Sequence, residues 1–156
     1  MQETDIDPRY THFIQHTVRT RLVYSLQDRE DFFAECPSEE YYDELGQPIA
    51  VWCFWNSETD ALACQQEEWE NFALATFSLD EFMNEILLDM DADAKLVGVA
   101  FDKDLFGTEI EPIDLLSDLL DEITAQGLTH EFEQFDELQR YRQEWLAAMD
   151  TPTIIH

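Results

Sequence analysis

The residues that could carry chemistry in this chain are carboxylates, and one short segment concentrates them. Four acidic side chains flank two adjacent tyrosines in the segment Glu39, Glu40, Tyr41, Tyr42, Asp43 and Glu44. Tyrosine beside charged residues is typical of protein interfaces, because the ring offers apolar area and the hydroxyl group a hydrogen bond. We interpret the segment as a surface that binds a basic protein. The alternative interpretation is a solvated loop.

A second acidic cluster surrounds a tryptophan, with Glu67, Glu68 and Glu70 placed around Trp69. We include these three glutamates among the candidate partner-binding residues. The pattern also fits a purely structural arrangement, in which Trp69 packs inward and leaves the glutamates in water.

The chain as a whole carries one sign of charge. Of its 156 residues 36 are acidic and 8 are Lys or Arg, which gives a formal charge of −28. None of the 65 residues from Glu30 to Ala94 is basic, whereas 18 are acidic. Such a surface repels polyanions, so the composition excludes binding to nucleic acid and argues against anionic membranes. Uncompensated like charge opposes folding but steers cationic partners, and this favours a basic protein partner.

The sequence contains no recognisable motif for catalysis, for cofactor binding or for metal binding. The four glycines are too widely spaced for a phosphate loop, a dinucleotide fingerprint or a nucleophile elbow. The acidic run at Asp89 lacks the glycine and the final glutamate of a calcium loop. His12 and His16 stand four apart without the glutamate of HExxH, which favours a plain helix face. We therefore expect no cofactor, no metal and no enzymatic activity.

The cysteines and the N-terminal residues indicate the cellular compartment in which the protein is expected. Cys36, Cys53 and Cys64 are odd in number and lack CxxC spacing, which is typical of reduced thiols. The first seven residues lack the basic start and apolar run of a signal peptide, and no stretch approaches the ~20 apolar residues of a membrane helix. We expect a cytoplasmic protein.

Capping signals and hydrophobic spacing predict the elements that must position these groups. Residues 49–55 are apolar at successive positions, which predicts a central strand covered on both faces. Pro37 is expected to end the strand before it, and residues 72–77 fit either helix or strand. The expected helices cover 8–20, 57 to about 71, a segment after the Ser78 capping box, 112–126 and 130–149, and the expected strands cover 22–26, 32–36, 49–55 and 96–101.

This order of elements predicts an α+β fold with a small, mainly antiparallel sheet packed by amphipathic helices. We treat residues 1–156 as one acidic domain. The helix at 130–149 is a candidate C-terminal appendage, because it follows Gly127 and carries aromatic residues at 132, 135, 141 and 145. Burial of that aromatic side within the monomer and self-association into a homodimer are both open.

Several short motifs come in an order that resembles an uncharacterised bacterial family, the domain of unknown function numbered twenty-seven fifty. The resemblance runs from Arg21 to about Leu119 and carries no activity, cofactor or site residue with it. The turn that is Pro-Trp-Pro-like in the family is Phe54-Trp55-Asn56 here, and the C-terminal helix is extra. The matching pieces are Leu22–Leu26, Gly46–Trp52, Ala63 before Glu68–Trp69, Phe77–Phe82, Leu96–Val99 and Glu109–Pro112.

These observations favour a non-enzymatic acidic binding protein that neutralises a basic partner. The most concrete form is an immunity protein or inhibitor that covers the cationic cleft of a toxin such as a nuclease. A DNA mimic that blocks a DNA-binding protein is a second hypothesis, since carboxylates on a helix advance by about 1.5 Å per residue and can approach the charge density of a duplex. An acidic housekeeping or salt-adapted protein without a specific partner is a third hypothesis, and an enzyme of unknown type is a fourth.

Overall fold

The computed structural model describes residues 7–150, without the side chains of 149 and 150. Residues 1–6, on which the expectation about a signal peptide largely rests, and residues 151–156 lie outside the described part. The elements are α1 (Pro8–Thr20), β1 (Leu22–Gln27), β2 (Glu35–Tyr42), β3 (Pro48–Phe54), α2 (Glu58–Ala63), η2 (Glu67–Trp69), β4 (Ala73–Ser78), α3 (Leu79–Glu81), η3 (Phe82–Ile86), α4 (Leu87–Ala92), β5 (Leu96–Val99), β6 (Thr108–Ile110), α5 (Pro112–Ala125), η4 (Thr129–Glu131) and α6 (Phe135–Asp150).

The β structure consists of two sheets, and the α+β class with mainly antiparallel pairing is confirmed. The larger sheet has the strand order β2-β3-β5-β6, and only its β3–β5 pair is parallel. The smaller sheet pairs β1 with β4 in antiparallel register. A bridge between Tyr24 and Trp55 joins the two sheets at the end of β3.

Strand β3 lies in the middle of the larger sheet and is covered on both faces, as its uninterrupted apolar sequence predicts. Phe54 belongs to the core that the helices complete, whereas Val51 and Cys53 belong to a second core beneath α2 and η2. All three side chains are fully buried. The sheet therefore separates two apolar cores.

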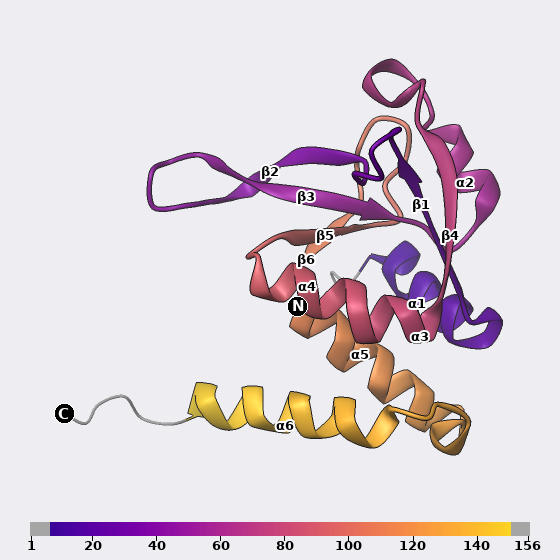
Figure 1. Ribbon diagram of the computed structural model, residues 1–156, viewed down its shortest axis with the longest axis vertical. Coiled ribbons are helices and arrows are strands. Elements are labelled where there is room, and N and C mark those ends of the chain that lie inside the picture. The colour runs from indigo at the N-terminus through magenta and orange to yellow at the C-terminus, as the bar shows by residue number, and fades with distance from the viewer. Residues whose placement is uncertain (1–6, 151–156) are drawn as a thin grey trace.

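Helices α3, α4, α5 and α6 stack in layers on one side of the larger sheet (Figure 1). The short α2 contributes Ala61 to the core on the other face. Helices α3 and α4 lie next to the larger sheet, α5 lies below them, and α6 lies outermost along α5. Local sequence sets the starts: the Asp7 carboxylate accepts the N–H of Arg9 at α1, and Ser78 Oγ accepts the N–H of Glu81 at 3.0 Å. Phe135, in the first turn of α6, is buried in the helical core.

The prediction for the second strand was wrong. Residues 32–36 do not form a strand that Pro37 ends, because β2 starts at Glu35 and continues through Pro37 to Tyr42. Strand β2 is an edge strand, where the missing N–H of proline breaks no ladder bond. The acidic segment from Glu39 to Glu44, for which a solvated loop was the alternative interpretation, is consequently the outer half of β2 and the start of its turn into β3. Strand β1 pairs with β4, and the Gln27–Phe33 bridge joins it to the segment before β2.

Other boundaries also differ from the sequence-based ones. The helix expected to reach residue 71 ends at Ala63, because the chain is extended at Gln66 before η2. Residues 73–78 form β4. Strand β5 ends at Val99, because Ala100 takes a positive φ of 56°, and the short β6 was not expected. The last helix begins at Phe135 instead of 130. Within residues 7–150, none of the helices combines the length and apolar character needed to cross a bilayer.

Candidate partner-binding groove

The β2–β3 hairpin projects from the body of the molecule and carries the first acidic segment (Figure 1). All residues from Glu39 to Glu44 are exposed. The apolar surface beside them is exposed as well, since Tyr42 is 57% and Leu45 84% accessible. An exposed aromatic and aliphatic patch among carboxylates is the composition of a surface that a partner could cover.

Ser38 fixes the base of this segment. Its hydroxyl accepts the N–H groups of Glu40 and Tyr41 at 3.1 and 2.9 Å and donates to Glu109 Oε1 at 2.6 Å. Ser38 is only 3% exposed, and it sits where the β2–β3 register shifts. The shift is a bulge that places several residues of β2 opposite one residue of β3. The hydrogen bonds of Ser38 therefore hold Glu39 to Tyr41 in one exposed arrangement.

Asp43 differs from its acidic neighbours, because its carboxylate is used inside the turn. Its Oδ1 accepts the N–H of Leu45 at 2.8 Å and the N–H of Gln47 at 2.9 Å. Gly46 takes a φ of +79°, which is a left-handed conformation that suits glycine. Among the four predicted carboxylates of the hairpin, Asp43 thus maintains the turn, whereas the carboxylates of Glu39, Glu40 and Glu44 take part in no hydrogen bond or ion pair within the described residues.

The second acidic cluster lies on η2. Trp69 is 6% exposed and packs edge-on against Trp55, with ring centroids 6.3 Å apart. Glu67, Glu68 and Glu70 remain exposed. The inward packing of Trp69 matches the structural interpretation of this pattern, and it also presents the three glutamates to solvent from a rigid base.

The two acidic clusters, far apart in sequence, meet at one groove. Two hollows of about 400 and 370 Å³ share Cys36, Pro37 and Leu105 as common lining residues. We call this feature the Cys36 groove. Its larger hollow is lined by Glu39, Tyr42 and Glu109, and its smaller one by Glu67, Glu68 and Lys103. The other predicted residues, Glu40, Tyr41, Asp43, Glu44 and Glu70, do not line it.

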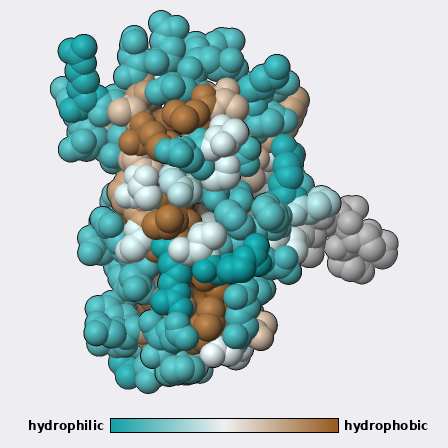
Figure 2. Space-filling model, turned by 90° about the vertical axis from the view of Figure 1, so that its right-hand side faces the viewer, coloured by the Kyte–Doolittle hydropathy of each residue, from teal (hydrophilic) through white to brown (hydrophobic). Residues whose placement is uncertain are grey.

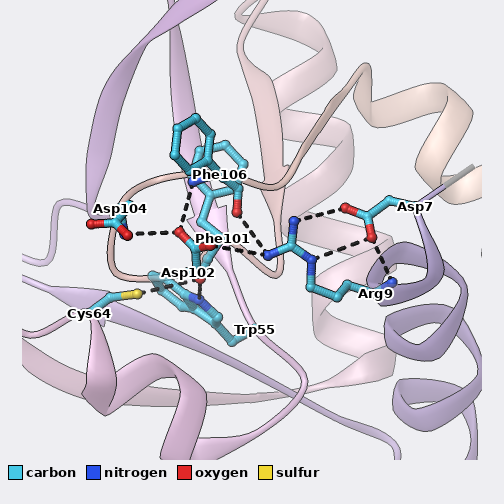
Figure 3. A network of polar contacts seen from close by, with 8 residues as sticks. All are labelled: Asp7, Arg9, Trp55, Cys64, Phe101, Asp102, Asp104 and Phe106. Atoms are coloured by element: carbon cyan, nitrogen blue, oxygen red, sulfur yellow. Dashed lines mark hydrogen bonds and ion pairs between the residues drawn. The ribbon is translucent and has the colours of Figure 1, made fainter. Parts of the chain in front are cut away.

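The loop that supplies Leu105 is held by a polar network (Figure 3). Asp102 Oδ1 accepts the N–H groups of Asp104 and Phe106 at 2.9 and 3.1 Å. The Arg9 guanidinium donates to the Phe106 carbonyl oxygen at 3.2 Å and to Asp102 Oδ2 at 3.4 Å. The N–H of Phe106, with smaller contributions from Asp104 and Arg9, lowers the pKa of Asp102. These hydrogen bonds therefore fix the loop that places Leu105 in the lining of the groove.

Cys36 is the most readily ionised of the three thiols. Its sulfur lies 4.0 Å from that of Cys53, and this hydrogen bond lowers the pKa of Cys36 despite its burial and the nearby carboxylates. Burial raises the pKa of Cys53 well above the ordinary value and that of Cys64 to about 11. Among residues 7–150 there is no cluster of three or more His, Cys, Asp or Glu side chains placed to hold a metal ion.

Sequence reasoning missed Leu105, Glu109 and Cys36 as members of the groove. Glu109 lies on the unexpected strand β6, and Cys36 was placed in a different strand with no assigned role. One signal was available for Leu105, since an apolar pair at 105 and 106 inside a polar turn segment is unusual.

The fold and groove define a small acidic α+β protein with a lined surface hollow and a projecting hairpin. Residues 10–119 match the family described as a protein of unknown function, DUF2750, and the chain belongs to that family. The match covers the groove, the hairpin and most of α5, while α6 lies beyond it. Comparisons with curated proteins and with solved structures give no match.

Proposed function

We propose that this protein is a non-enzymatic binding protein that neutralises a basic protein partner through the β2–β3 hairpin and the Cys36 groove. The observation that carries the proposal is the meeting of the two acidic clusters at one groove, with Glu39 and Tyr42 on one side and Glu67 and Glu68 on the other. A cationic protein surface laid over the groove would place its charges against carboxylates from both clusters at once.

Electrostatics support this proposal. Four ion pairs are present among the described residues, and they engage the carboxylates of Asp7, Asp102, Glu131 and Asp121. The carboxylates of the hairpin and of η2 take part in none of them. In the view of Figure 2, apolar residues form separate patches within a mostly hydrophilic surface. The unpaired negative charge of the hairpin and of η2 accelerates encounter with a cationic partner, and it makes the association rate fall as the salt concentration rises.

The most concrete partner is a toxin such as a nuclease, met in the cytoplasm. A nuclease presents a positive cleft to phosphate groups, so an anionic protein face can occupy the same cleft. The protein would then act as an immunity protein or inhibitor, and it would need no catalytic group of its own. A partner of this type loses its activity when the acidic protein is bound.

The proposal is tested with the intact chain as bait in lysate of host cells, followed by association kinetics with the captured protein. A variant with Glu39→Gln, Glu40→Gln and Glu67→Gln removes three groove and hairpin charges but keeps Asp43, which holds the turn. We expect its association rate to fall about tenfold at low salt, since steering contributes factors of 10 or more.

The matched control removes three exposed carboxylates of the last helical region, with Glu133→Gln, Asp136→Asn and Glu137→Gln. It changes the net charge equally and should bind within about twofold of the native chain. Equal loss in both variants, or no basic partner at any salt concentration, would overturn the proposal and leave an acidic protein without a specific partner.

A further inference from the structure

A third hollow, of about 310 Å³, adjoins the groove and has a different lining. Five aromatic side chains and three carboxylates surround it, and no Lys or Arg does. It shares Glu68 and Trp69 with the smaller hollow of the Cys36 groove. Its lining residues are Asp28, Phe32, Phe33, Glu35, Trp52, Glu68, Trp69 and Phe72.

Contacts between side chains hold the aromatic part of the lining in place. Phe33 packs against Trp52 with ring centroids 5.2 Å apart, and the Trp52 indole N–H donates to Glu35 Oε1 at 2.9 Å. The Lys95 ammonium lies 5.5 Å from the centroid of the Trp52 ring. The indole that lines this hollow thus already attracts a cation of its own chain, because the face of an aromatic ring is electronegative.

Phe32 lines the hollow and is 62% accessible. The turn before it holds it there: Asp28 Oδ1 accepts the N–H groups of Glu30 and Phe32, both at 2.9 Å. The Asp28 N–H also donates to the Phe32 carbonyl oxygen at 2.9 Å. A large apolar ring is therefore kept in water next to three carboxylates.

We propose that this hollow receives an arginine side chain of a protein partner. Guanidinium is planar and weakly hydrated, so it stacks on aromatic rings while its N–H groups donate to carboxylates at the edge of the same site. Glu68 makes no contact among the described residues that would occupy its carboxylate, and Asp28 uses only Oδ1 in the turn. A lysine side chain has no planar face to stack and fills this site less well.

This inference rests on the proposed function for the identity of the partner, but the site can be tested without it. The probe is a capped Gly-Arg-Gly peptide titrated into the ¹⁵N-labelled protein, with capped Gly-Lys-Gly and Gly-citrulline-Gly as comparisons. The four tryptophan indole N–H signals report the location. Those of Trp52 and Trp69 should shift, whereas that of Trp55, which is fully buried and donates to the Phe101 carbonyl oxygen, should not.

The chain offers two matched pairs of variants. Phe32→Ala is compared with Phe106→Ala, because Phe32 and Phe106 are 62% and 61% exposed and only Phe32 lines the hollow. Glu68→Gln is compared with Glu70→Gln, because both residues are exposed on or beside η2 and only Glu68 lines it. We expect Phe32→Ala and Glu68→Gln each to weaken binding of the arginine peptide at least threefold, with their controls unchanged.

Three results would overturn the inference: equal binding of the citrulline peptide, equal effects of Phe32→Ala and Phe106→Ala, or a Trp55 shift as large as that of Trp52. The two proposals fail separately. If the arginine peptide shifts Trp52 as expected but no basic partner exists in the host, the arginine site stands and the proposed function fails. If a partner binds Phe32→Ala as well as it binds the native chain, the arginine site fails and the proposed function stands.

Discussion

At the scale of single residues, carboxylates that look equivalent in the sequence have different tasks. Asp43 and Asp28 each accept two backbone N–H groups and hold a tight turn, whereas Glu39 and Glu68 line hollows. An aspartate reaches the backbone two to four residues ahead, which the longer glutamate does less readily. These two aspartates therefore shape the surface, with Oδ2 of Asp28 still available to a partner, whereas Glu39 and Glu68 leave their whole carboxylates available.

The three cysteines should differ in reactivity at the same residue scale. Because the Cys53 hydrogen bond lowers the pKa of Cys36, its thiolate forms at a lower pH than an ordinary thiol. We expect iodoacetamide at pH 8 to label Cys36 several-fold faster than Cys53 or Cys64, as measured by peptide mass spectrometry. Replacing the donor in Cys53→Ala should slow labelling of Cys36 and move its pH profile upward. Faster labelling of Cys64 in the native chain would contradict this assignment.

At the scale of elements, the Tyr141 hydroxyl is one of the polar groups that hold the last helix to the rest of the fold. Arg142 is another, since it donates to Ser117 and Asp121. Tyr141 on α6 donates to Asp91 Oδ2 at 2.8 Å, and Asp91 belongs to α4. Burial, together with this hydrogen bond, raises the pKa of Tyr141 to about 12. The raised value means that the folded state favours the protonated phenol, so the stabilisation is complete below the unfolded pKa of about 10 and is lost as pH rises to about 12.

Tyr141→Phe should lower the free energy of unfolding by about 1–2 kcal/mol, because Asp91 loses its donor. Between pH 10 and 12 the native chain should lose this advantage and approach the variant. Urea denaturation at a series of pH values measures both effects. Tyr42→Phe is the control, since the exposed Tyr42 hydroxyl has no partner among the described residues, and its stability should not change. A Tyr141→Phe variant as stable as the native chain at pH 7 would contradict this role.

Elements with local signals were the ones that the sequence could predict. Pro8 and Pro112 start α1 and α5, and Ser57 and Ser78 cap the helices that follow them. Strand β4 carries no such signal, because it exists through pairing with β1, which is distant in sequence. Strand β6 pairs with its neighbour β5, but its three residues are too few to show a periodic pattern. The passage of β2 through Pro37 likewise depends on its place at the edge of the sheet.

The distinction between local signals and contacts made only in the folded chain also explains which parts of the candidate site could be predicted. The acidic clusters could be recognised because each is contiguous in sequence. The groove could not, because Cys36, Leu105 and Glu109 come from β2, a loop and β6, and only the folded chain brings them together. The aromatic hollow combines residues from 28 to 72 for the same reason.

At the scale of the whole molecule, the charge of −28 opposes compaction. The described residues form few ion pairs, so most of this repulsion is relieved only by dissolved cations. Raising NaCl from 0.05 to 0.5 M should therefore increase the midpoint of thermal unfolding, by about 2–4 °C for each kcal/mol of repulsion screened. Calorimetry across the salt series measures this.

The increase in the midpoint of thermal unfolding should level off as the screening length shrinks to a few ångströms. An equal mass of sucrose should not produce an increase that levels off in this way. A midpoint that stays constant or falls with NaCl would mean that the carboxylates are spaced widely enough not to repel each other. In that case the acidic surface would oppose folding less than its composition indicates.

The edge position of β2 also bears on how copies of this chain behave when crowded together. An outer strand offers unpaired amide and carbonyl groups to any other strand, and this is how fibrils are seeded. Here Pro37 removes one amide donor, the bulge at Ser38 breaks the flat ladder, and Glu39 and Glu40 repel an identical edge. The opposite edge, β6, has only three residues. The features that shape the projecting hairpin therefore also prevent this edge of the sheet from acting as a template for amyloid-like growth.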